Sequence, residues 1–284
     1  MKFVKMHGTG NDYIFVNCFE ETVINPKELA VAMSNRHFGI GGDGVIFIKP
    51  SDRRVGGIRA DAKMEIYNAD GSRAEMCGNG IRCVALFMYT YIKLERDTVY
   101  IETDDGTIKP VKLNMRGKSV ETMVVNMGAP KLDASEIPAK LPGYERIINK
   151  SVNIAGYEYS ITCVNMGNPH CVIFTDDIDG FPLESVGPNF EYAIEYFPER
   201  INVEAVKCIT RKYCKMRVWE RGSGITLSCG TGACAAVVAG ILNGYMDDEV
   251  TVELDGGILS IKWDRISGNV FMTGDAKKVF IGEI

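Results

Sequence analysis

Apolar and polar residues alternate over short stretches along most of the chain, a pattern typical of half-buried strands. Helical spacing of apolar residues is confined to three segments. We expect strands at positions 3–6, 13–18, 45–48, 63–67, 98–102, 107–113, 120–127, 157–164, 171–175, 202–209 and 213–220, and helices at 25–36, 79–93 and 230–242. The pattern predicts a chain rich in β-structure with few helices.

Turn and helix-end signals refine these boundaries. Asn25 is a typical N-cap residue, Pro26 suits the first helical position, and Glu28 suits the first turn. The sequence Asn-Ala-Asp-Gly at 68–71 predicts a turn after the strand 63–67. Positions 129–144 contain three prolines and little periodicity. We interpret this segment as a linker between two domains.

The second half of the sequence repeats a pattern of the first. The motif Cys77-Gly78-Asn79-Gly80 begins one apolar helix, and Cys229-Gly230-Thr231-Gly232 begins the other. An asparagine, Asn11 or Asn168, precedes each motif at a similar distance along the chain. Two domains of one fold explain this shared order better than a coincidence of short glycine motifs.

Composition narrows the function classes. The 284 residues are 46% hydrophobic with a formal net charge of -5, which is typical of a globular protein and unusual for one that binds nucleic acid. The N-terminus lacks the apolar core of a secretory signal, and the apolar stretches 83–92 and 233–242 are shorter than the ~20 residues of a membrane span. We expect a cytoplasmic protein with no membrane or nucleic-acid partner, and its nine cysteines as thiols. One basic run, interpreted as a solvated strand face, comprises Lys207, Arg211, Lys212, Lys215 and Arg217.

Each Cys-Gly-X-Gly motif combines a thiol with a possible anion site. The cysteine directly precedes a helix, where backbone N–H groups lack intrahelical acceptors and the helix dipole is positive. We expect this setting to lower the thiol pKa and to let a carboxylate bind beside the sulfur. Cys77 and Cys229 on opposite sides of one cleft can remove a Cα proton from one face and return a proton to the other. The pair therefore predicts an amino-acid racemase or epimerase.

Other uses of these cysteines are less well supported. We do not interpret Cys77 with Cys83, or Cys229 with Cys234, as zinc sites, and the sequence has no C-x-x-C redox motif. The glycine-rich run 39–44 matches the dinucleotide-binding motif only formally, because it precedes a strand and does not open a helix. Two buried structural cysteines remain the alternative.

Taken together, these motifs closely resemble diaminopimelate epimerase, within the wider group that includes proline racemase and the phenazine-pathway isomerases. The resemblance covers nearly the whole chain. It is carried by the segments 7–12 (HGTGND), 68–72 (NADGS), 76–82 (MCGNGIR), 165–170 (NMGNPH), 200–203 (RINV) and 220–234 (ERG to CGTGAC). Gly44, where some members have glutamine, and Ile225 depart from the family pattern.

The resemblance implies an α+β fold of two pseudo-symmetric domains, each a mixed or antiparallel β-barrel-like sheet wrapped around a central helix. It implies an N-terminal half at 1–128 that carries Cys77, to which a C-terminal strand at about 275–284 returns, and a second half at 129–274 that carries Cys229. It also implies a homodimer that interconverts LL-2,6-diaminopimelate and the meso form, in lysine and peptidoglycan precursor biosynthesis. Neither pyridoxal phosphate nor a metal is implied.

The same resemblance implies roles for individual residues. Cys77 and Cys229 form the acid/base pair, one as thiolate and one as thiol, while His170 and Glu220 assist proton movement. Backbone N–H groups of Gly78, Asn79, Gly230 and Thr231 hold the reacting carboxylate. The other substrate contacts fall to Asn11, Asn68, Asn168, Asn202, Glu220 and Arg221.

Alternatives remain at this stage. Considered alone, Asn68 fits a turn, and Glu220 with Arg221 fits a surface pair at a strand end. A racemase of another amino acid would use the same two cysteines. A protein that only binds an amino acid or a small dicarboxylate would not need them.

Overall fold

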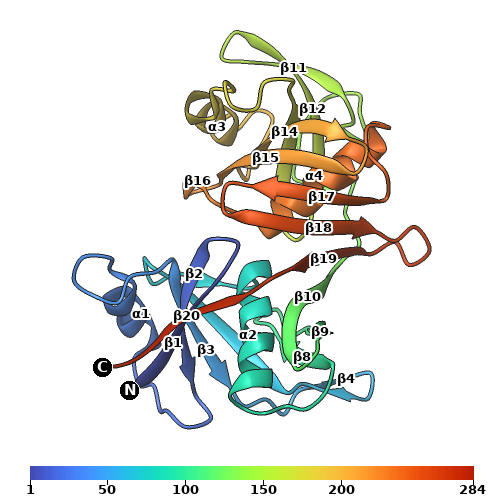
Figure 1. Cartoon of the computed structure of the whole chain (residues 1–284). Helices are drawn as coiled ribbons and strands as arrows, with labels where there is room; N and C mark the ends of the chain where they lie inside the picture. Colours follow the sequence, from blue (N-terminus) through green and yellow to red (C-terminus); the bar gives the residue numbers. More distant parts are fainter. The chain divides into compact units, whose positions relative to one another are not determined.

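The computed structural model describes residues 1–284. The chain forms two compact units (Figure 1). Unit 1 comprises Met1–Asn126 together with Thr273–Ile284, and unit 2 comprises Met127–Met272. The last strand of the chain therefore belongs to the same unit as the first.

Unit 1 is a mixed sheet around one helix. Its strands are neighbours in the order β20 (Lys277–Glu283), β1 (Lys2–Gly8), β2 (Asn11–Asn17), β3 (Gly44–Lys49), β6 (Ala62–Asn68), β8 (Thr98–Glu102), β9 (Ile108–Arg116) and β10 (Ser119–Gly128). The β2–β3 and β6–β8 pairs are parallel and the others antiparallel. Short strand β7 (Arg73–Ala74) pairs with β6, and β4 (Arg54–Val55) pairs with β5 (Ile58–Arg59).

Two helices cover the two faces of this sheet. Helix α2 (Gly78–Thr90) contacts β1, β2, β8 and β9, strands from distant parts of the sheet, so the sheet curves around it. Helix α1 (Pro26–Ser34) packs on β2, β3 and β6. Residues of β2 and β3 are buried on both faces because alternate side chains reach opposite helices, with Ile14 and Val45 in the cluster beneath α1.

Unit 2 repeats this arrangement. Its strands are β11 (Lys150–Ile154), β12 (Tyr157–Asn165), β13 (Pro169–Phe174), β14 (Asn202–Thr210), β15 (Tyr213–Glu220), β17 (Glu249–Leu254), β18 (Gly257–Trp263) and β19 (Val270–Gly274), with β16 (Gly224–Thr226) paired to β15. Helix α4 (Gly230–Leu242) contacts β12, β13, β14, β15, β17 and β18, and α3 (Leu183–Glu191) packs on β14, β15 and β16.

The two units have the same topology, which confirms the predicted pseudo-symmetric α+β fold. Strands β1, β2, β3, β6, β8 and β9 of unit 1 pair in the sequence antiparallel, parallel, antiparallel, parallel and antiparallel. Strands β12, β13, β14, β15, β17 and β18 of unit 2 pair in that same sequence. Helix α2 thus corresponds to α4, and α1 to α3.

Two sequence interpretations need correction. The segment 129–144 is not an open linker, because it contains the 3₁₀ helix Ala134–Glu136 and its Ile137 and Ala139 are buried in the core of unit 2. Helix α3 was not predicted, because Gly187 and Pro188 lie within it.

None of the helices combines the length and the apolar character that a membrane-spanning helix requires.

Candidate active site

Cys77 is the N-cap residue of α2. Its backbone is extended (φ -136°, ψ 116°), and its sulfur accepts a hydrogen bond from Gly80 N at 3.2 Å. The Ile81 N–H bonds to the carbonyl of Cys77 at 2.9 Å. The amides of Gly78 and Asn79 precede these two and head the helix, where an anion can be bound beside the sulfur. The predicted position of the cysteine at a helix start is confirmed.

A tight hairpin brings Asn11 to this helix end. Strands β1 and β2 pair up to Gly8 opposite Asn11, which leaves a two-residue turn of Thr9 and Gly10. Both turn residues have positive φ, 50° and 82°, as the twist of a two-residue hairpin requires. Asn11 Oδ1 consequently lies 3.4 Å from Cys77 Sγ, which donates to it.

Tyr13 lies next to the same thiol. Burial raises its pKa well above the ordinary value, and the neighbouring Cys77 and Asp43 raise it further. Tyr13 therefore stays a neutral phenol beside the sulfur. Its position corresponds to His170 in unit 2, because Tyr13 pairs with Gly44 across β2–β3 as His170 pairs with Asn202 across β13–β14.

Cys229 caps α4 in the same way. Its backbone is extended (φ -123°, ψ 112°), its sulfur accepts from Gly232 N at 3.4 Å, and the Thr231 hydroxyl lies 3.4 Å away. The amides of Gly230 and Thr231 head the helix. The two cysteines therefore occupy equivalent positions in the two units.

The surroundings of Cys229 contain two carboxylates, the fully buried Glu204 and the half-buried Glu220. Burial, followed by the charges of Glu220 and Glu204, raises the pKa of Cys229 well above its ordinary value. Hydrogen bonds from Thr231 and Gly232 favour the thiolate but are outweighed. The helix start thus favours the thiolate as expected, but burial and the two carboxylates outweigh it, and the sequence pattern carried no information on burial.

Glu220 and His170 lie in the same buried cluster. Burial raises the pKa of Glu220, although hydrogen bonds from Thr226 and Cys229 and the charge of His170 lower it. His170 is fully buried, with Nδ1 2.6 Å from Glu204 Oε1 and Nε2 2.9 Å from the side-chain oxygen of Asn168. Two proton-carrying side chains are therefore available near Cys229.

Asn202 and Arg221 complete the site in unit 2. Asn202 donates through Nδ2 to the carbonyl of Pro169 at 2.7 Å and accepts from the backbone N–H of Arg221 at 2.9 Å. The guanidinium of Arg221 donates to the carbonyl of Glu199 at 2.7 Å. Asn202 therefore ties the end of β15 to β13, the strand that carries His170.

Asn68 stands apart from these contacts. It ends β6 and donates to the Ser72 hydroxyl at 3.0 Å, as a turn residue does. It lies nine residues before Cys77, as Glu220 lies nine residues before Cys229, and strands β6 and β15 correspond. Its position in unit 1 is thus equivalent to that of Glu220.

Sequence reasoning missed Glu204, Asp43 and Arg82. Glu204 is a single acid among the apolar residues Val203, Ala205 and Val206 of β14, and Arg82 is a single charge in the apolar helix α2. Both side chains are fully buried. A lone charge within an apolar element was the available signal, because such a charge is buried only with partners.

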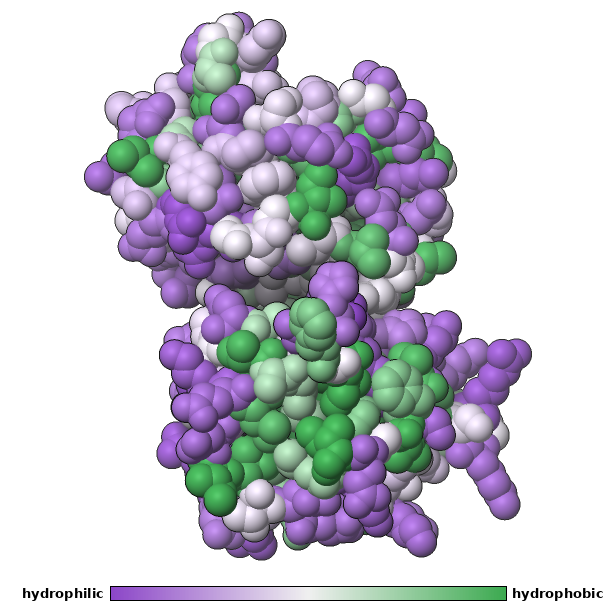
Figure 2. Space-filling model, turned by 90° about the vertical axis from the view of Figure 1, so that its left-hand side faces the viewer, coloured by the Kyte–Doolittle hydropathy of each residue, from purple (hydrophilic) through white to green (hydrophobic).

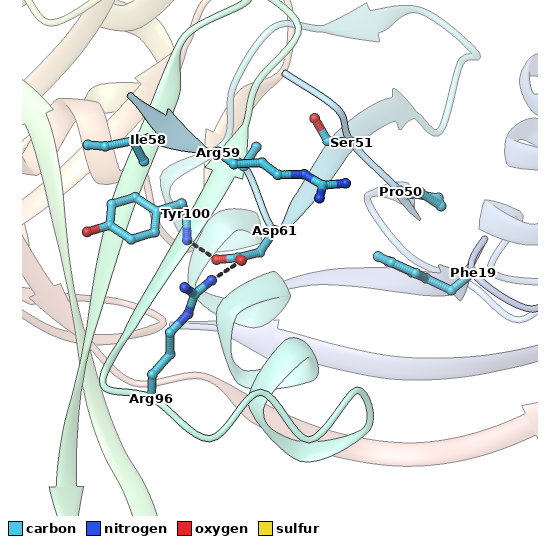
Figure 3. A pocket seen from close by; sticks show the side chains of 9 residues that line it. Phe19, Pro50, Ser51, Ile58, Arg59, Asp61, Arg96 and Tyr100 are labelled. Atoms are coloured by element: carbon cyan, nitrogen blue, oxygen red, sulfur yellow. Dashed lines mark hydrogen bonds and ion pairs between the residues drawn. The ribbon is translucent and has the colours of Figure 1, made fainter. Parts of the chain in front are cut away.

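A separate pocket lies in unit 1 and contains none of the predicted site residues. Its volume is about 490 Å³, and Phe19, Ile58, Arg59, Arg96 and Tyr100 are among its walls (Figure 3). Its two guanidinium groups are already paired, Arg96 with Asp61 and Arg59 with Asp52. No cluster of three His, Cys, Asp or Glu side chains suitable for a metal ion occurs in the structure.

Comparison with known proteins points to one family. The family model described as diaminopimelate epimerase matches residues 3–132 and 162–279. A diaminopimelate epimerase of Acetivibrio thermocellus is 49% identical over 284 residues, covering 100% of this chain and 98% of that protein. One from Methanococcus maripaludis is 47% identical, covering 100% and 99%. A probable proline racemase from Agrobacterium radiobacter K84 has the same fold, with a TM-score of 0.70 at 13% identity over 100% of this chain and 92% of that one.

Proposed function

The chain belongs to the diaminopimelate epimerase family, a family of isomerases, and we propose that it interconverts LL- and meso-2,6-diaminopimelate by moving one Cα proton between Cys77 and Cys229. The observation that carries this proposal is the duplicated N-cap cysteine. Each unit offers one thiol whose sulfur lies beside the N-terminus of a 13-residue helix. An inversion at carbon needs a base that removes the proton and an acid that returns one, and two thiols can exchange these roles between the two directions of the reaction.

The helix ends provide the second requirement, stabilisation of the carbanion. As the Cα proton leaves, negative charge accumulates on the substrate carboxylate. We propose that backbone amides of both units donate hydrogen bonds to this carboxylate. They are the amides of Gly78 and Asn79 in unit 1 and those of Gly230 and Thr231 in unit 2. Preorganised donors of this kind contribute ~3–4 kcal/mol each to transition-state stabilisation.

His170 and Glu220 assist the proton at Cys229. Because burial and two carboxylates raise the pKa of Cys229, this thiol holds its proton until a change nearby favours the thiolate. The raised pKa of Glu220 and its hydrogen bond from Cys229 make it a suitable temporary acceptor. His170 can exchange a proton with the same cluster through its contact with Glu204.

The distal end of diaminopimelate is a second zwitterion, and its recognition falls to polar side chains. Arg221 is suited to a bidentate bond with the distal carboxylate. Asn11, Asn68, Asn168 and Asn202 orient the substrate without adding charge. Of these, Asn11 and Asn168 are hydrogen-bonded to groups at the two thiol sites in the structure.

Two single variants test the proposal. We expect Cys77→Ala and Cys229→Ala each to lose epimerisation of LL-diaminopimelate, measured as formation of the meso form by chiral chromatography. Cys163→Ala, which removes a buried thiol of β12 outside the site, is the matched control and should remain active. A panel of L-amino acids assayed with the unaltered protein tests the substrate. Unimpaired epimerisation by either site variant, or faster racemisation of an amino acid that lacks the distal zwitterion, would contradict the proposal.

We further propose that the protein is a homodimer in the cytoplasm. Besides the sequence resemblance, support comes from unit 1, where hydrophobic side chains gather on one face (Figure 2). On β20, Val279, Phe280 and Ile281 are all exposed in the single chain. All nine cysteines are thiols in the structure, as a reducing compartment would keep them. Sedimentation equilibrium at twice the chain mass of 31.3 kDa would support the dimer, and the mass of a single chain would contradict it.

A further inference from the structure

Four side chains of unit 1 form a hydrogen-bonded series that passes the Cys77 sulfur. Arg82 Nη2 donates to Asn79 Oδ1 at 2.9 Å, and Asn79 Nδ2 donates to Asn11 Oδ1 at 3.4 Å. Asn11 Nδ2 donates to Asp43 Oδ2 at 2.7 Å. The thiol of Cys77 lies against Oδ1 of Asn11, the third side chain of the series.

The two ends of the series fix its direction. A guanidinium group can only donate hydrogen bonds, so Asn79 must present its oxygen to Arg82 and its NH₂ group to Asn11. A carboxylate can only accept, so Asn11 must present its NH₂ group to Asp43. The amide of Asn11 consequently has one orientation, with its oxygen on Cys77. The contact with the Asp43 carboxylate, at 2.7 Å, is shorter than the contact with Asn79, at 3.4 Å, and is the stronger of the two constraints.

Both ends are firmly held. Arg82 is fully buried and also donates to the carbonyls of Gly78 and Asp275, at 3.2 and 3.0 Å. Asp43 accepts from Arg36 at 2.8 Å and from the backbone N–H of Asp12 at 3.0 Å. The acceptor on the thiol is therefore part of the folded structure of unit 1.

Unit 2 has no such series. The equivalent positions, taken from strand register and helix start, place Ile201 where unit 1 has Asp43, Thr231 where it has Asn79, and Cys234 where it has Arg82. The side-chain oxygen of Asn168 bonds to His170. The hydrogen-bonded series is thus specific to the site of Cys77.

We propose that Asp43 and Arg82 are positioning residues that hold the Asn11 amide with its oxygen on the Cys77 sulfur, and so favour the protonated form of Cys77 before it donates its proton. An oxygen acceptor stabilises an S–H group and faces a thiolate unfavourably. The inference rests on the proposed function only in giving Cys77 a proton to transfer. Asp43 and Arg82 act through Asn11 and Asn79 and are not themselves catalytic residues.

Other titratable and charged groups also surround Cys77, and the test must separate their effects. Tyr13 on β2 is hydrogen-bonded to Cys77 and Asn11 and interacts with the charge of Cys77. Cys83 on α2 also interacts with that charge, and Arg82 and Asp275 lie near Cys83. Behind Asp43, Arg36 and Lys5 are both paired with Asp12, whose carboxylate is 2.7 Å from Arg36. Asp12 is therefore a matched control, because it shares Arg36 with Asp43 but its side chain does not bind the Asn11 amide.

The experiment measures alkylation of Cys77 by iodoacetamide against pH in the reduced, substrate-free protein, resolved by peptide mass spectrometry. In Asp43→Asn the carboxylate is replaced by an amide that can itself donate, so the amide of Asn11 can reverse against its weaker 3.4 Å contact with Asn79 and present NH₂ to the sulfur. We expect the midpoint for Cys77 to fall by about 1 pH unit, which makes alkylation about tenfold faster at pH 7. Asp12→Asn should change the rate by less than about twofold, because its side chain contacts Lys5 and Arg36 and not the Asn11 amide or the thiol. Cys229 provides an internal reference in every sample.

Further variants keep the inference open to refutation. In the double variant Asn11→Asp with Asp43→Asn, a carboxylate replaces the amide oxygen at the thiol, and alkylation of Cys77 should become slower than in the unaltered protein. Should Asp43→Asn not fold, Asn11→Leu removes the acceptor directly and should accelerate alkylation to a similar extent. Equal acceleration by Asp12→Asn and Asp43→Asn, or no acceleration in Asn11→Leu, would overturn the inference. Because no substrate is present, these outcomes do not depend on whether the protein epimerises diaminopimelate.

Discussion

Replacing Glu204 by alanine tests the buried cluster around Cys229. Glu204 is fully buried, its Oε1 lies 2.6 Å from His170 Nδ1, and its Oε2 has no hydrogen-bond partner. The alanine variant leaves the His170 ring in an apolar interior without its carboxylate partner. Glu204→Gln has nearly the same shape and retains an oxygen that can accept from His170.

The expected loss follows from these contacts. Breaking a buried pair by removing one partner costs ~3–5 kcal/mol. The variant also removes the unsatisfied Oε2 of Glu204, which is a gain of ~1 kcal/mol or more. We therefore expect a net loss of about 3 kcal/mol for Glu204→Ala. For a unit of this size, at ~2–4 °C per kcal/mol, the loss lowers the Tm by about 6–12 °C.

Differential scanning calorimetry at neutral pH measures this change directly. Glu158→Ala on the exposed side of β12 is the control, and we expect it to remain within ~0.5 kcal/mol of the unaltered protein. Glu204→Gln should lie between the two. A decrease of less than about 2 °C for Glu204→Ala, or equal decreases for the alanine and glutamine variants, would refute the view that Glu204 supports His170.

Three further changes have defined outcomes. A Cβ at Gly80 would lie 2.6 Å from Ile46 Cδ1, so Gly80→Ala should destabilise unit 1 by ~1–3 kcal/mol in urea unfolding, and an unchanged midpoint would contradict this packing. Burial raises the pKa of Cys83 from 9.0 to about 12, so the contribution of its neutral thiol to stability is complete below pH 9 and is lost as pH rises towards 12. Between pH 9 and 10.5 the unaltered protein should therefore lose ~2 kcal/mol more stability than Cys83→Ala. Parallel curves of stability against pH for the two proteins would contradict this prediction. Glu220→Gln removes a carboxylate that raises the pKa of Cys229, so alkylation of Cys229 should begin at lower pH; an unchanged pH profile would show that Glu220 does not act on this thiol.

Local features of the fold were predictable from sequence where short-range signals decide the structure. The strands 98–102 and 213–220 and the helix 230–242 have the predicted bounds. Both Cys-Gly-X-Gly motifs predicted helix starts, because the cap and the glycines that follow it lie within one turn. The duplicated motif also predicted the duplicated topology.

Features that depend on distant partners were not predictable. Helix α3 contains Gly187 and Pro188, which disfavour a helix. It forms because Val186 and Phe190 are buried in the hydrophobic core of unit 2, against which Trp219 also packs. The role of Glu204 depends on the parallel pairing of β13 and β14, which brings it to a histidine 34 residues earlier in the chain. The raised pKa of Cys229 likewise depends on burial and on two carboxylates that no local pattern reveals.

Transfer of the Cα proton to and from solvent-exchangeable thiols is the central claim, and proton NMR in deuterated water tests it most directly. The unaltered, reduced protein is incubated with LL-diaminopimelate without added pyridoxal phosphate or metal. We expect the α-proton signal to disappear as the meso form accumulates, because a proton arriving from Cys77 or Cys229 has exchanged with solvent. Formation of the meso form with the α-proton signal retained over many turnovers would contradict proton transfer through these two thiols.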